Sequence, residues 1–376
     1  MSTILVSLVS DQTLPNIFFI RELDNVDFYL LLTTPQMEEK NKSDSIIAAS
    51  GKEKKLFTII TVKETSMTEI SAALDMLDFK DSDQFIVNLT GGTKIMSIAV
   101  YNYFRNKSSE IYYLPIGKNE YHKIFPEVKK KEHDLKYRIS VQDYMTACNV
   151  DILNPNDLNQ LVRPVVYTKK FFDFFCTATT LDLRDISTIR DIMNKKKKKL
   201  KKHPLPIEEY EWLGPFLERA SFVPLAKGVL SLSEIRYLCG EWFEEFVYNL
   251  IKKEHSLDDC FIAKGIQIRR KDVQNELDVV FTLQNNLHTI ECKTGLYDSS
   301  AQRNILDETI YKAQALRREF TLFVRSHIFT TVKHGSARTM IREHSERRSK
   351  LFGINLVEGG VLQDAVERRN AVLAIK

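Results

Sequence analysis

Short apolar runs alternate with helix-length segments along roughly the first 125 residues of the chain. Runs that are apolar on both faces are typical of parallel strands that helices cover on each side. Repeated strand–helix units joined by right-handed crossovers form a doubly wound, Rossmann-like α/β sheet, and the pattern predicts that fold here. A turn around Gly117 adds an antiparallel edge strand, YHKIFPE. The apolar runs cover residues 4–9, 27–33, 56–62, 84–89 and 110–116.

A second α/β unit is predicted in the C-terminal part of the chain. It begins with an amphipathic helix over residues 233–254, in which Trp242 is a core residue of the apolar stripe. Strand and helix patterns follow, so we expect a mixed sheet. The strands are expected at residues 261–269, 276–283, 287–293 and 321–325, and the helices at 302–318 and 337–350.

The stretch between the two units mixes short helical patterns with several prolines and the basic run KKKKKLKKH at residues 195–203. A solvated loop and a segment that contacts phosphates both fit this composition. We therefore divide the chain into an N-terminal α/β domain (1–135), a partly helical connecting segment (136–230) and a C-terminal α/β domain (231–376).

Composition places the chain among globular proteins. Of its 376 residues, 43% are hydrophobic and 28% charged, which excludes a disordered or collagen-like chain. No apolar run reaches the ~18–20 residues that a membrane-spanning helix needs, and the N-terminus lacks the basic segment of a secretory signal. The five cysteines are scattered without a CxxC pair, which disfavours a zinc site and suits a reducing compartment. We expect a cytoplasmic protein with no membrane partner.

Positive charge is concentrated towards the C-terminus. Residues 1–135 hold 16 Lys and Arg against 19 Asp and Glu, whereas residues 301–350 hold 11 against 5. This asymmetry favours a polyanionic partner, although a solvated basic surface explains it equally well. The candidate phosphate contacts are the lysines at 195–199 and Arg317, Arg318, Arg338, Arg342, Arg347 and Arg348.

Two polar loops follow the first and fourth predicted strands. If the sheet has the usual strand order, these strands flank the crevice where doubly wound sheets bind ligands. The second loop, NLTGGTK (88–94), has two glycines that allow close approach and opens directly into a helix whose free amides attract anions. A glycine turn with a threonine helix cap is the structural alternative. Neither GxxxxGK[ST] nor GxGxxG is present, which argues against ATP hydrolysis and NAD binding.

The strongest catalytic pattern combines Asp278, Glu291 and Lys293. If Asn285 and Asn286 form a two-residue hairpin turn, Asp278 stands opposite Lys293 and becomes a diagonal neighbour of Glu291. All three side chains then project from one face of the hairpin, because residues two apart share a face.

Two such carboxylates can hold one divalent metal ion that polarises a phosphate and activates water. The lysine can orient that water and stabilise negative charge in the transition state. Glu244 on the preceding helix is the expected further ligand, with Glu245 as the alternative. The pattern predicts a metal-dependent endonuclease with Asp278 and Glu291 as metal ligands and Glu244 and Lys293 as further catalytic residues.

Both halves of the chain resemble known families. VSDQTLPN, NLTGGTKIMS and LPIGKN resemble the CRISPR-associated Rossmann-fold (CARF) ligand domain, and GEWFEEFVYNL, NELDVV and IECKTG resemble the PD-(D/E)xK restriction-endonuclease-like fold. Together they resemble the single-chain ancillary nucleases of type III CRISPR systems. One departure is that the first motif carboxylate lies in ELD rather than in a Pro-Asp pair, which affects local stiffness only.

The resemblance implies an antiviral nuclease that cyclic tetra-adenylate activates and that uses Mn²⁺ or Mg²⁺ to cut DNA, RNA or both without sequence specificity. It also implies a homodimer in which two CARF domains bind one ring across their two-fold axis. The residues that the resemblance places against the ring are Ser10, Gln12, Thr13, Thr90, Gly91, Gly92, Thr93 and Lys94, with Lys118 and Asn119 as further contacts.

Three alternatives remain at this point. Arg338 and His344 fit the Arg-x4–6-His pattern of metal-free HEPN ribonucleases, although those domains are helical. A ligand-gated DNA-binding regulator would leave the acidic residues unexplained. The CARF pocket could itself degrade the ring, but Asp11 is its only carboxylate. His288 is expected at the surface rather than in a metal site.

Overall fold

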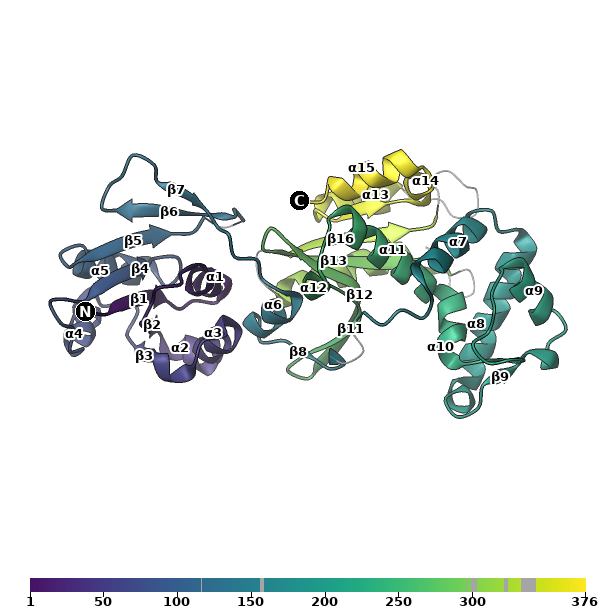
Figure 1. Cartoon of the computed structure of the whole chain (residues 1–376), viewed down its shortest axis with the longest axis horizontal. Helices are drawn as coiled ribbons and strands as arrows, with labels where there is room; N and C mark the ends of the chain where they lie inside the picture. The colour runs from purple at the N-terminus through teal and green to yellow at the C-terminus, as the bar shows by residue number, and fades with distance from the viewer. Residues whose placement is uncertain (116, 156–158, 296, 299–302, 321–323, 333–342) are drawn as a thin grey trace.

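The computed structural model describes residues 1–115, 117–155, 159–295, 297–298, 303–320, 324–332 and 343–376. Two α/β domains lie next to each other, and a helical lobe lies beyond the second one, at the opposite end from the N-terminal domain (Figure 1). Among the described helices, none is long and apolar enough to cross a membrane.

The N-terminal sheet has the predicted doubly wound arrangement. Its strand order is β3-β2-β1-β4-β5-β6-β7, so the order reverses between β1 and β4, as expected. The first five strands are parallel and β6 adds the predicted antiparallel edge, to which β7 is an unpredicted extension. The strands are β1 (Thr3–Leu8), β2 (Phe28–Thr33), β3 (Phe57–Thr61), β4 (Gln84–Asn88), β5 (Ser109–Tyr113), β6 (Glu120–Phe125) and β7 (Glu132–Asp134).

Helices cover both faces of this sheet and bury separate apolar clusters. One face packs against α1 and α3, and the other packs against α4 and α5. The helices of this domain are α1 (Leu14–Glu22), α2 (Pro35–Glu39), α3 (Lys42–Ser50), α4 (Met67–Asp75) and α5 (Lys94–Phe104), with a short helical turn η1 (Lys54–Leu56).

The segment after β7 divides between two structures. Its first part, α6 (Val141–Ala147) and β8 (Asp151–Ile152), joins the C-terminal domain, because β8 pairs with β11 at the edge of that sheet. The remainder forms the helical lobe, whose aromatic side chains pack onto Trp242. The lobe contains α7 (Val165–Cys176), α8 (Thr180–Leu200), β9 (Leu205–Pro206), η3 (Ile207–Glu209), α9 (Leu213–Arg219), β10 (Val229–Leu230) and α10 (Leu232–Arg236).

The C-terminal sheet is mixed, as expected, with the order β17-β16-β13-β12-β11-β8. The strands are β11 (Ile262–Arg270), β12 (Val273–Leu283), β13 (Asn286–Lys293), β16 (Val324–Thr330) and β17 (Asn355–Val357), with a separate pair β14 (Tyr297–Asp298) and β15 (Arg303–Asn304).

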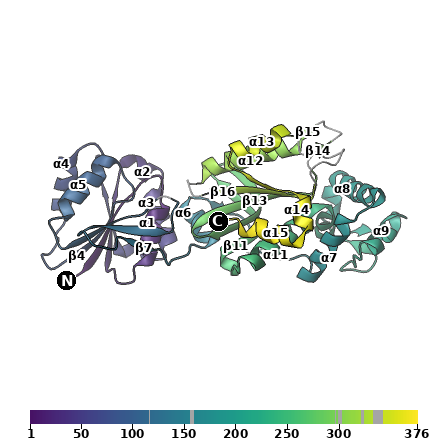
Figure 2. The same ribbon diagram turned by 90° about the horizontal axis from the view of Figure 1, so that it is seen from above.

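Figure 2 shows α12 and α13 on one side of this sheet and α11 and α15 on the other. The helical elements are η4 (Tyr237–Glu241), α11 (Trp242–Glu254), η5 (Asp259–Phe261), α12 (Ile305–Glu319), α13 (Glu343–Leu351), α14 (Gly359–Gln363) and α15 (Ala365–Leu373). Trp242 is fully buried, which confirms its predicted core role.

The expected register of the catalytic hairpin is wrong by two residues. Val279 pairs with Ile290 and Leu283 with Asn286, so the turn residues are Gln284 and Asn285 rather than Asn285 and Asn286. Both turn residues have positive φ (49° and 63°), as a tight turn compatible with strand twist requires. An even shift keeps every side chain on its predicted face. Continued by one residue, the observed register sets Asp278 opposite Glu291 instead of opposite Lys293.

The prediction of a surface position for His288 is wrong as well. Its ring is fully buried, stacks on Phe281 with centroids 4.7 Å apart, and lies with Nδ1 3.1 Å from Nε2 of His327. Burial lowers the pKa of His288 to about 2 and that of His327 to about 3. Both rings are therefore neutral near pH 7 and act as core side chains.

A shared apolar core and a polar clamp join the two α/β domains. One cluster of buried side chains runs from α1 and α3 through α6 to β11, β12 and α12. At its edge, Asn285 accepts a bond from the Ile139 amide (2.9 Å) and donates to Asn119 Oδ1 (2.8 Å) and the Tyr137 carbonyl (2.9 Å). The hairpin turn of the C-terminal domain is thus bound directly to the N-terminal one.

Replacing Asn285 with glycine is expected to weaken this joint. Glycine keeps the positive φ but removes three hydrogen bonds and leaves the buried Ile139 amide unpaired, so the free energy of unfolding falls by about 2–3 kcal/mol. Urea unfolding measures this change. Asn286→Gly is the control, because among the described residues its side chain bonds only to the local Gln284 carbonyl (3.2 Å). An equal loss in both variants would contradict the role of the clamp.

Candidate functional site

The structure brings Asp278, Glu291 and Lys293 together, as the sequence predicted. Lys293 Nζ lies 3.0 Å from Asp278 Oδ2 and 3.1 Å from Glu291 Oε2. The side chains of Asp278 and Glu291 are only 13% and 4% exposed. One ammonium group therefore contacts two buried carboxylates, which would repel each other without a cation.

The backbone also orients Asp278. Its Oδ2 accepts a 2.7 Å hydrogen bond from the Cys292 amide on the neighbouring strand β13. Burial and the negative charge of Glu291 raise the pKa of Asp278. Burial by itself lowers the pKa of Lys293, but Asp278 and Glu291 raise it above its usual value, so this side chain stays charged.

A second lysine, which the sequence reasoning missed, contacts the same site. Lys312 Nζ on α12 lies 2.8 Å from Glu291 Oε1 and 3.2 Å from the Glu276 carbonyl. Each oxygen of Glu291 thus has its own ammonium partner. The available signal was a lysine on the helix that follows the hairpin, but the direction of its side chain depends on how that helix crosses the sheet.

The two adjacent glutamates of α11 have different surroundings. Glu245 is 1% exposed, accepts a bond from the Val162 amide, and lies 3.4 Å from Thr168 Oγ1 and 3.5 Å from Lys264 Nζ. It therefore anchors the helical lobe to α11. Glu244, by contrast, is near Asp278.

Burial, followed by the charges of Asp278, Glu241 and Glu276, raises the pKa of Glu244 well above its usual value. Of the two, Glu244 is therefore the glutamate whose charge interacts with Asp278 of the acidic site. Glu241, at the end of the π-helical turn η4, and Glu276 on β12 add to this site and were not predicted.

Within the described residues, no three His, Cys, Asp or Glu side chains are placed to hold one metal ion. The donor set still suits a hard cation, because it consists of carboxylate oxygens. A positive group already contacts an oxygen of Asp278 and an oxygen of Glu291. A metal ion that binds both carboxylates would share them with Lys293 Nζ.

The two ligand loops of the N-terminal domain lie on neighbouring strands β1 and β4. Gly91 (φ 130°) and Gly92 (φ 62°) pack against the end of β1. A Cβ at Gly91 would lie 2.6 Å from the Leu8 carbonyl oxygen. Glycine is required here because the two loops approach each other closely.

Some predicted ring contacts are occupied by internal bonds. Thr13 is buried and donates to the Ala147 carbonyl at 2.6 Å, and Thr90 Oγ1 accepts from the Leu114 amide at 2.6 Å. Asn119 bonds to the Leu135 carbonyl and to Asn285. These three side chains fix the loops.

The remaining predicted contacts lie on more accessible parts of the loops. Thr93 caps α5 through the Met96 amide (3.2 Å) and, like Lys94, is exposed. Ser10 Oγ donates to the Gln12 carbonyl (3.2 Å), and Lys118 pairs with Glu120 (3.2 Å).

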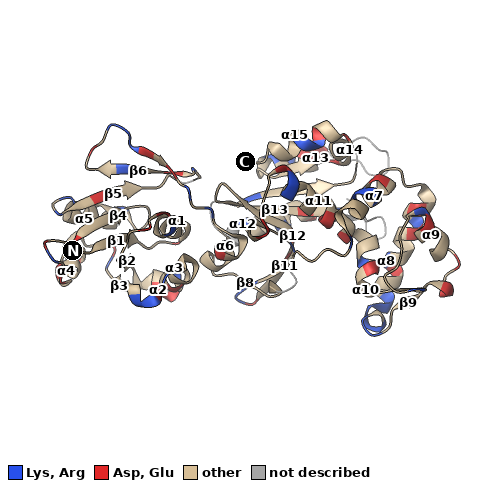
Figure 3. Cartoon of the chain, viewed as in Figure 1, with Lys and Arg blue, Asp and Glu red and all other residues tan. Residues whose placement is uncertain are grey.

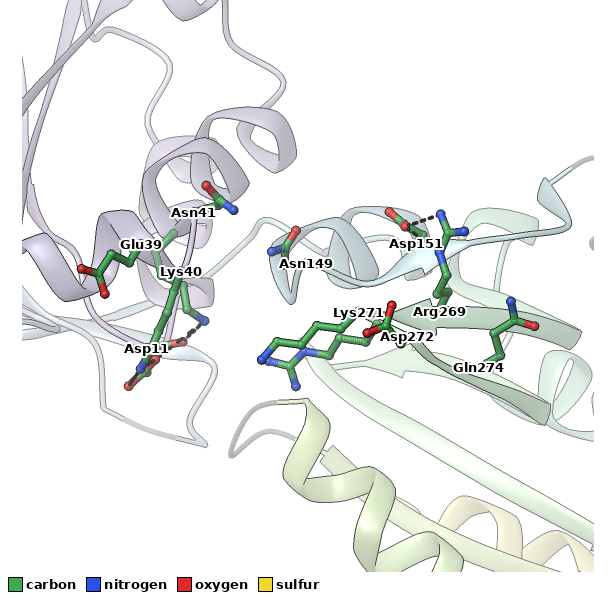
Figure 4. A pocket seen from close by; sticks show the side chains of 12 residues that line it. Asp11, Glu39, Lys40, Asn41, Asn149, Asp151, Arg269, Lys271, Asp272 and Gln274 are labelled. Carbon is green, nitrogen blue, oxygen red and sulfur yellow. Dashed lines mark hydrogen bonds and ion pairs between the residues drawn. The ribbon is translucent and has the colours of Figure 1, made fainter.

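A polar cleft of about 890 Å³ separates the first ligand loop from the β11–β12 turn (Figure 4). On one side, Asp11 pairs with Lys40 (2.9 Å), and its carbonyl accepts from Lys42 (2.9 Å). On the other side lie Arg269, paired with Asp151 (3.0 Å), and Lys271. Sequence reasoning missed this cleft because its two walls are more than 100 residues apart in the sequence.

The alternative catalytic pair and the predicted basic residues are only partly visible. Arg338 and Arg342, and the side chain of Arg318, lie outside the described residues. His344 Nε2 lies 3.3 Å from Asp307, which also pairs with Arg348 (2.9 Å). Arg317 donates to the Phe352 carbonyl (2.6 Å), and Arg347 pairs with Glu343 on its own helix.

Two family models match the chain. Residues 4–144 match the Card1 CARF domain, and residues 232–373 match the Card1-like endonuclease domain. No curated protein matches.

Several solved structures are similar to the chain, among them the following three. Can2 from Sulfobacillus thermosulfidooxidans in complex with cyclic tetra-adenylate is 22% identical with a TM-score of 0.72, and VC1899 from Vibrio cholerae is 18% identical with a TM-score of 0.73. Each alignment covers 98% of both chains. A type III CRISPR defence DNA nuclease activated by cyclic oligoadenylate is 14% identical with a TM-score of 0.55, over 93% of this chain and 52% of that one.

At these identities the structural matches establish the fold. The family models add a ligand-sensing domain at one end of the chain and a nuclease domain at the other, in agreement with the loops and the acidic site described above. The chain therefore belongs to the CARF-linked CRISPR ancillary nucleases, as a member with a Card1-type CARF domain and a Card1-like endonuclease domain.

Proposed function

We propose that the chain is a largely nonspecific nuclease of type III CRISPR defence, activated by cyclic tetra-adenylate and dependent on Mn²⁺ or Mg²⁺, that hydrolyses phosphodiester bonds of DNA, RNA or both. The observation that carries this proposal is the buried pair Asp278 and Glu291, bridged by Lys293 on the same face of a hairpin. None of the five cysteines, all of which lie among the described residues, forms a disulfide, which agrees with a cytoplasmic location.

Asp278 and Glu291 would hold the metal ion, with Glu244 as a further carboxylate. When bound, such an ion polarises the phosphate and lowers the pKa of an attacking water. Lys293 orients the phosphate or the water and stabilises developing negative charge. Lys312 keeps Glu291 in position through its 2.8 Å contact. Glu244 adds negative charge beside Asp278; burial and the neighbouring carboxylates raise its pKa, and a bound divalent ion would offset that repulsion.

The activator would bind at the loops after β1 and β4. Can2, which is similar over its whole length, was solved with cyclic tetra-adenylate, and this chain carries a CARF domain. Lys94 and the free amides at the start of α5 supply positive charge for phosphates.

A homodimer fits the same surface. Ile95 and Ile98 on α5 are 37% and 51% exposed, directly after the loop that holds Gly91 and Gly92. Exposed apolar side chains beside a ligand loop suit a two-fold contact in which both copies contribute the same residues to one ring.

The ligand loop has a direct connection to the nuclease. Thr13 bonds to Ala147 on α6, and α6 packs in the core that includes Leu277 of β12. Asp278 is the next residue on that strand. A shift of the loop on ring binding would therefore move the strand that carries the first catalytic carboxylate. Such coupling requires that the ring bind one arrangement more tightly than the other.

The alternatives have less support. The C-terminal domain is a mixed sheet rather than a helical HEPN domain. A DNA-binding regulator leaves the converging charges of Asp278, Glu291 and Lys293 without a role. Degradation of the ring lacks an obvious catalytic pair, since Asp11 is engaged by Lys40 and Lys42.

Replacing Glu291 with glutamine is expected to lower ring-activated cleavage by at least ~100-fold, because one metal ligand and one partner of Lys293 are lost. EDTA should abolish wild-type cleavage. A fluorogenic oligonucleotide assay with cyclic tetra-adenylate and Mn²⁺ measures both effects. His344→Ala is the control and should keep its activity. Cleavage that survives EDTA but is lost in His344→Ala would instead support the HEPN mechanism.

The neighbouring glutamates of α11 are expected to respond in opposite ways. Glu244→Ala should reduce cleavage by at least ~100-fold, because a carboxylate of the proposed metal site is lost. It should not lower the stability, because like charges already oppose the carboxylate that it removes. Glu245→Ala should lower the free energy of unfolding by about 2–4 kcal/mol, since Lys264 and the Val162 amide lose their buried partner. Cleavage rates and urea unfolding of both variants test this. A stable, inactive Glu245→Ala would reverse the assignment.

Lys94→Ala is expected to weaken binding of cyclic tetra-adenylate by about 10-fold, as loss of one charged phosphate contact predicts, without changing the unfolding temperature. Calorimetric titration with the ring measures this. The matched control is Lys63→Ala in the same domain, whose side chain is exposed and pairs with Glu69 (3.6 Å). Unchanged ring affinity in Lys94→Ala would exclude the predicted contact.

A further inference from the structure

The C-terminal end of α8 presents a dense group of lysines that the proposed catalytic site does not use. Figure 3 shows basic residues gathered at this end of the helical lobe, close to β9. Six of the lysines are exposed, and we call them the α8 lysines: Lys195, Lys197, Lys198, Lys199, Lys201 and Lys202.

We propose that the α8 lysines form a binding surface for the phosphate backbone of the polynucleotide substrate, outside the catalytic site. The inference rests on the proposed nuclease function and deepens it. It assigns the helical lobe a role in holding substrate.

The charge of this surface is not balanced within the protein. In the described part of the chain, no ion pair joins any of the α8 lysines to a carboxylate. Cations near a helix C-terminus stabilise the helix, but the effect is confined to the last turn, whereas these lysines cover two turns. A polyanion that released its counterions on contact would relieve the repulsion among them.

Lys196 shows what a structural lysine looks like at the same place. Its Nζ bonds to Tyr210 Oη at 2.9 Å and lies 5.5 Å from the centre of that ring. It is therefore tied to the lobe, whereas its neighbours point into solvent. The apolar residue of this run, Leu200, is buried. Without an exposed apolar anchor, the surface suits a phosphate backbone better than a protein groove or a membrane.

The spacing of the lysines matches a nucleic-acid strand. Lys195, Lys198 and Lys199 share one helix face, because residues three and four apart are neighbours. With Lys202 in the following turn, this face extends for about 10 Å. Phosphates along one strand of a duplex repeat every ~3.4 Å along its axis, so the face can contact about three of them.

The position of α8 is fixed relative to the catalytic site. Arg190 donates to the Cys239 carbonyl at 2.7 Å, in the π-helical turn that ends at Glu241. Near its start, Asp182 and Asp185 hold Arg219 at 2.7 and 2.8 Å. Lys199 follows Arg190 by nine residues, or about 14 Å along the helix. Substrate that reaches from the acidic site to the α8 lysines must therefore be several nucleotides long.

The test measures how tightly the full chain binds a labelled single-stranded oligonucleotide at several salt concentrations in the presence of cyclic tetra-adenylate. All proteins carry Glu291→Gln, so that the oligonucleotide is not cut during the measurement. The variant carries Lys→Gln at 195, 198, 199 and 202. We expect at least 10-fold weaker binding near 0.1 M salt and a decrease of about 2 in the slope of log affinity against log salt, from about three phosphate contacts at ~0.7 each.

The matched control carries Lys→Gln at 54, 55, 129 and 130, four exposed lysines of the N-terminal domain with the same change in charge. It should bind as the parent does. Equal losses of oligonucleotide affinity in both variants, or no loss in either, would overturn the proposal. So would an α8 variant that binds the oligonucleotide like its parent but no longer binds anionic lipid vesicles that the parent binds. Circular dichroism and ring affinity report on correct folding.

The two proposals fail in distinguishable ways. If wild-type protein with ring and Mn²⁺ cuts no polynucleotide, the nuclease function is wrong whatever the lysines do. If it cuts, but the α8 variant binds long oligonucleotides like its parent and, when made without Glu291→Gln, also cleaves them at the wild-type rate, only the role of α8 is wrong. We further expect the α8 variant without Glu291→Gln to cleave very short oligonucleotides at the wild-type rate, because these cannot reach α8.

Discussion

The C-terminal domain depends on one requirement: two carboxylates that are almost fully buried need a cation that contacts both. Lys293 meets this requirement for Asp278 and Glu291 at about 3 Å each. The backbone amide of Cys292 and the ammonium group of Lys312 complete the set of partners. Buried charges of one sign are costly unless they are paired, so the sheet, α11 and α12 must keep their relative positions for this site to persist.

The helical lobe and the N-terminal domain both reach this site through specific bonds. Glu245 joins the lobe to α11, one residue away from Glu244. Thr13 and Asn285 join the N-terminal domain to α6 and to the catalytic hairpin. Changes at either end of the molecule can therefore alter the position of the same few carboxylates.

Much of the fold and of the catalytic site could be predicted from the sequence. Both sheets, the strand reversal between β1 and β4, and the common face of Asp278, Glu291 and Lys293 follow from apolar periodicity and from the rule that side chains alternate along a strand. The hairpin register could not be predicted, because three polar residues in a row allow several turns and only backbone twist selects Gln284 and Asn285. The surface position predicted for His288 was wrong for a related reason. Its side chain lies on the inner face of the strand, and histidine occurs both in cores and on surfaces, so the residue type alone does not predict burial. Lys312 and the cleft at Asp11 depend on packing between distant segments, which periodicity does not report.

The apolar core that passes through α6 has a consequence for how such proteins can change. Side chains of the N-terminal domain, of α6 and of the C-terminal sheet form one continuous apolar core. Separating the two domains would therefore expose apolar side chains on both of them. If the nuclease domain were fused to the N-terminal domain of another protein, the side chains at the new interface would not pack together. Recombination between relatives should therefore succeed only where the exchanged segment carries α6 together with the residues that pack on both of its sides.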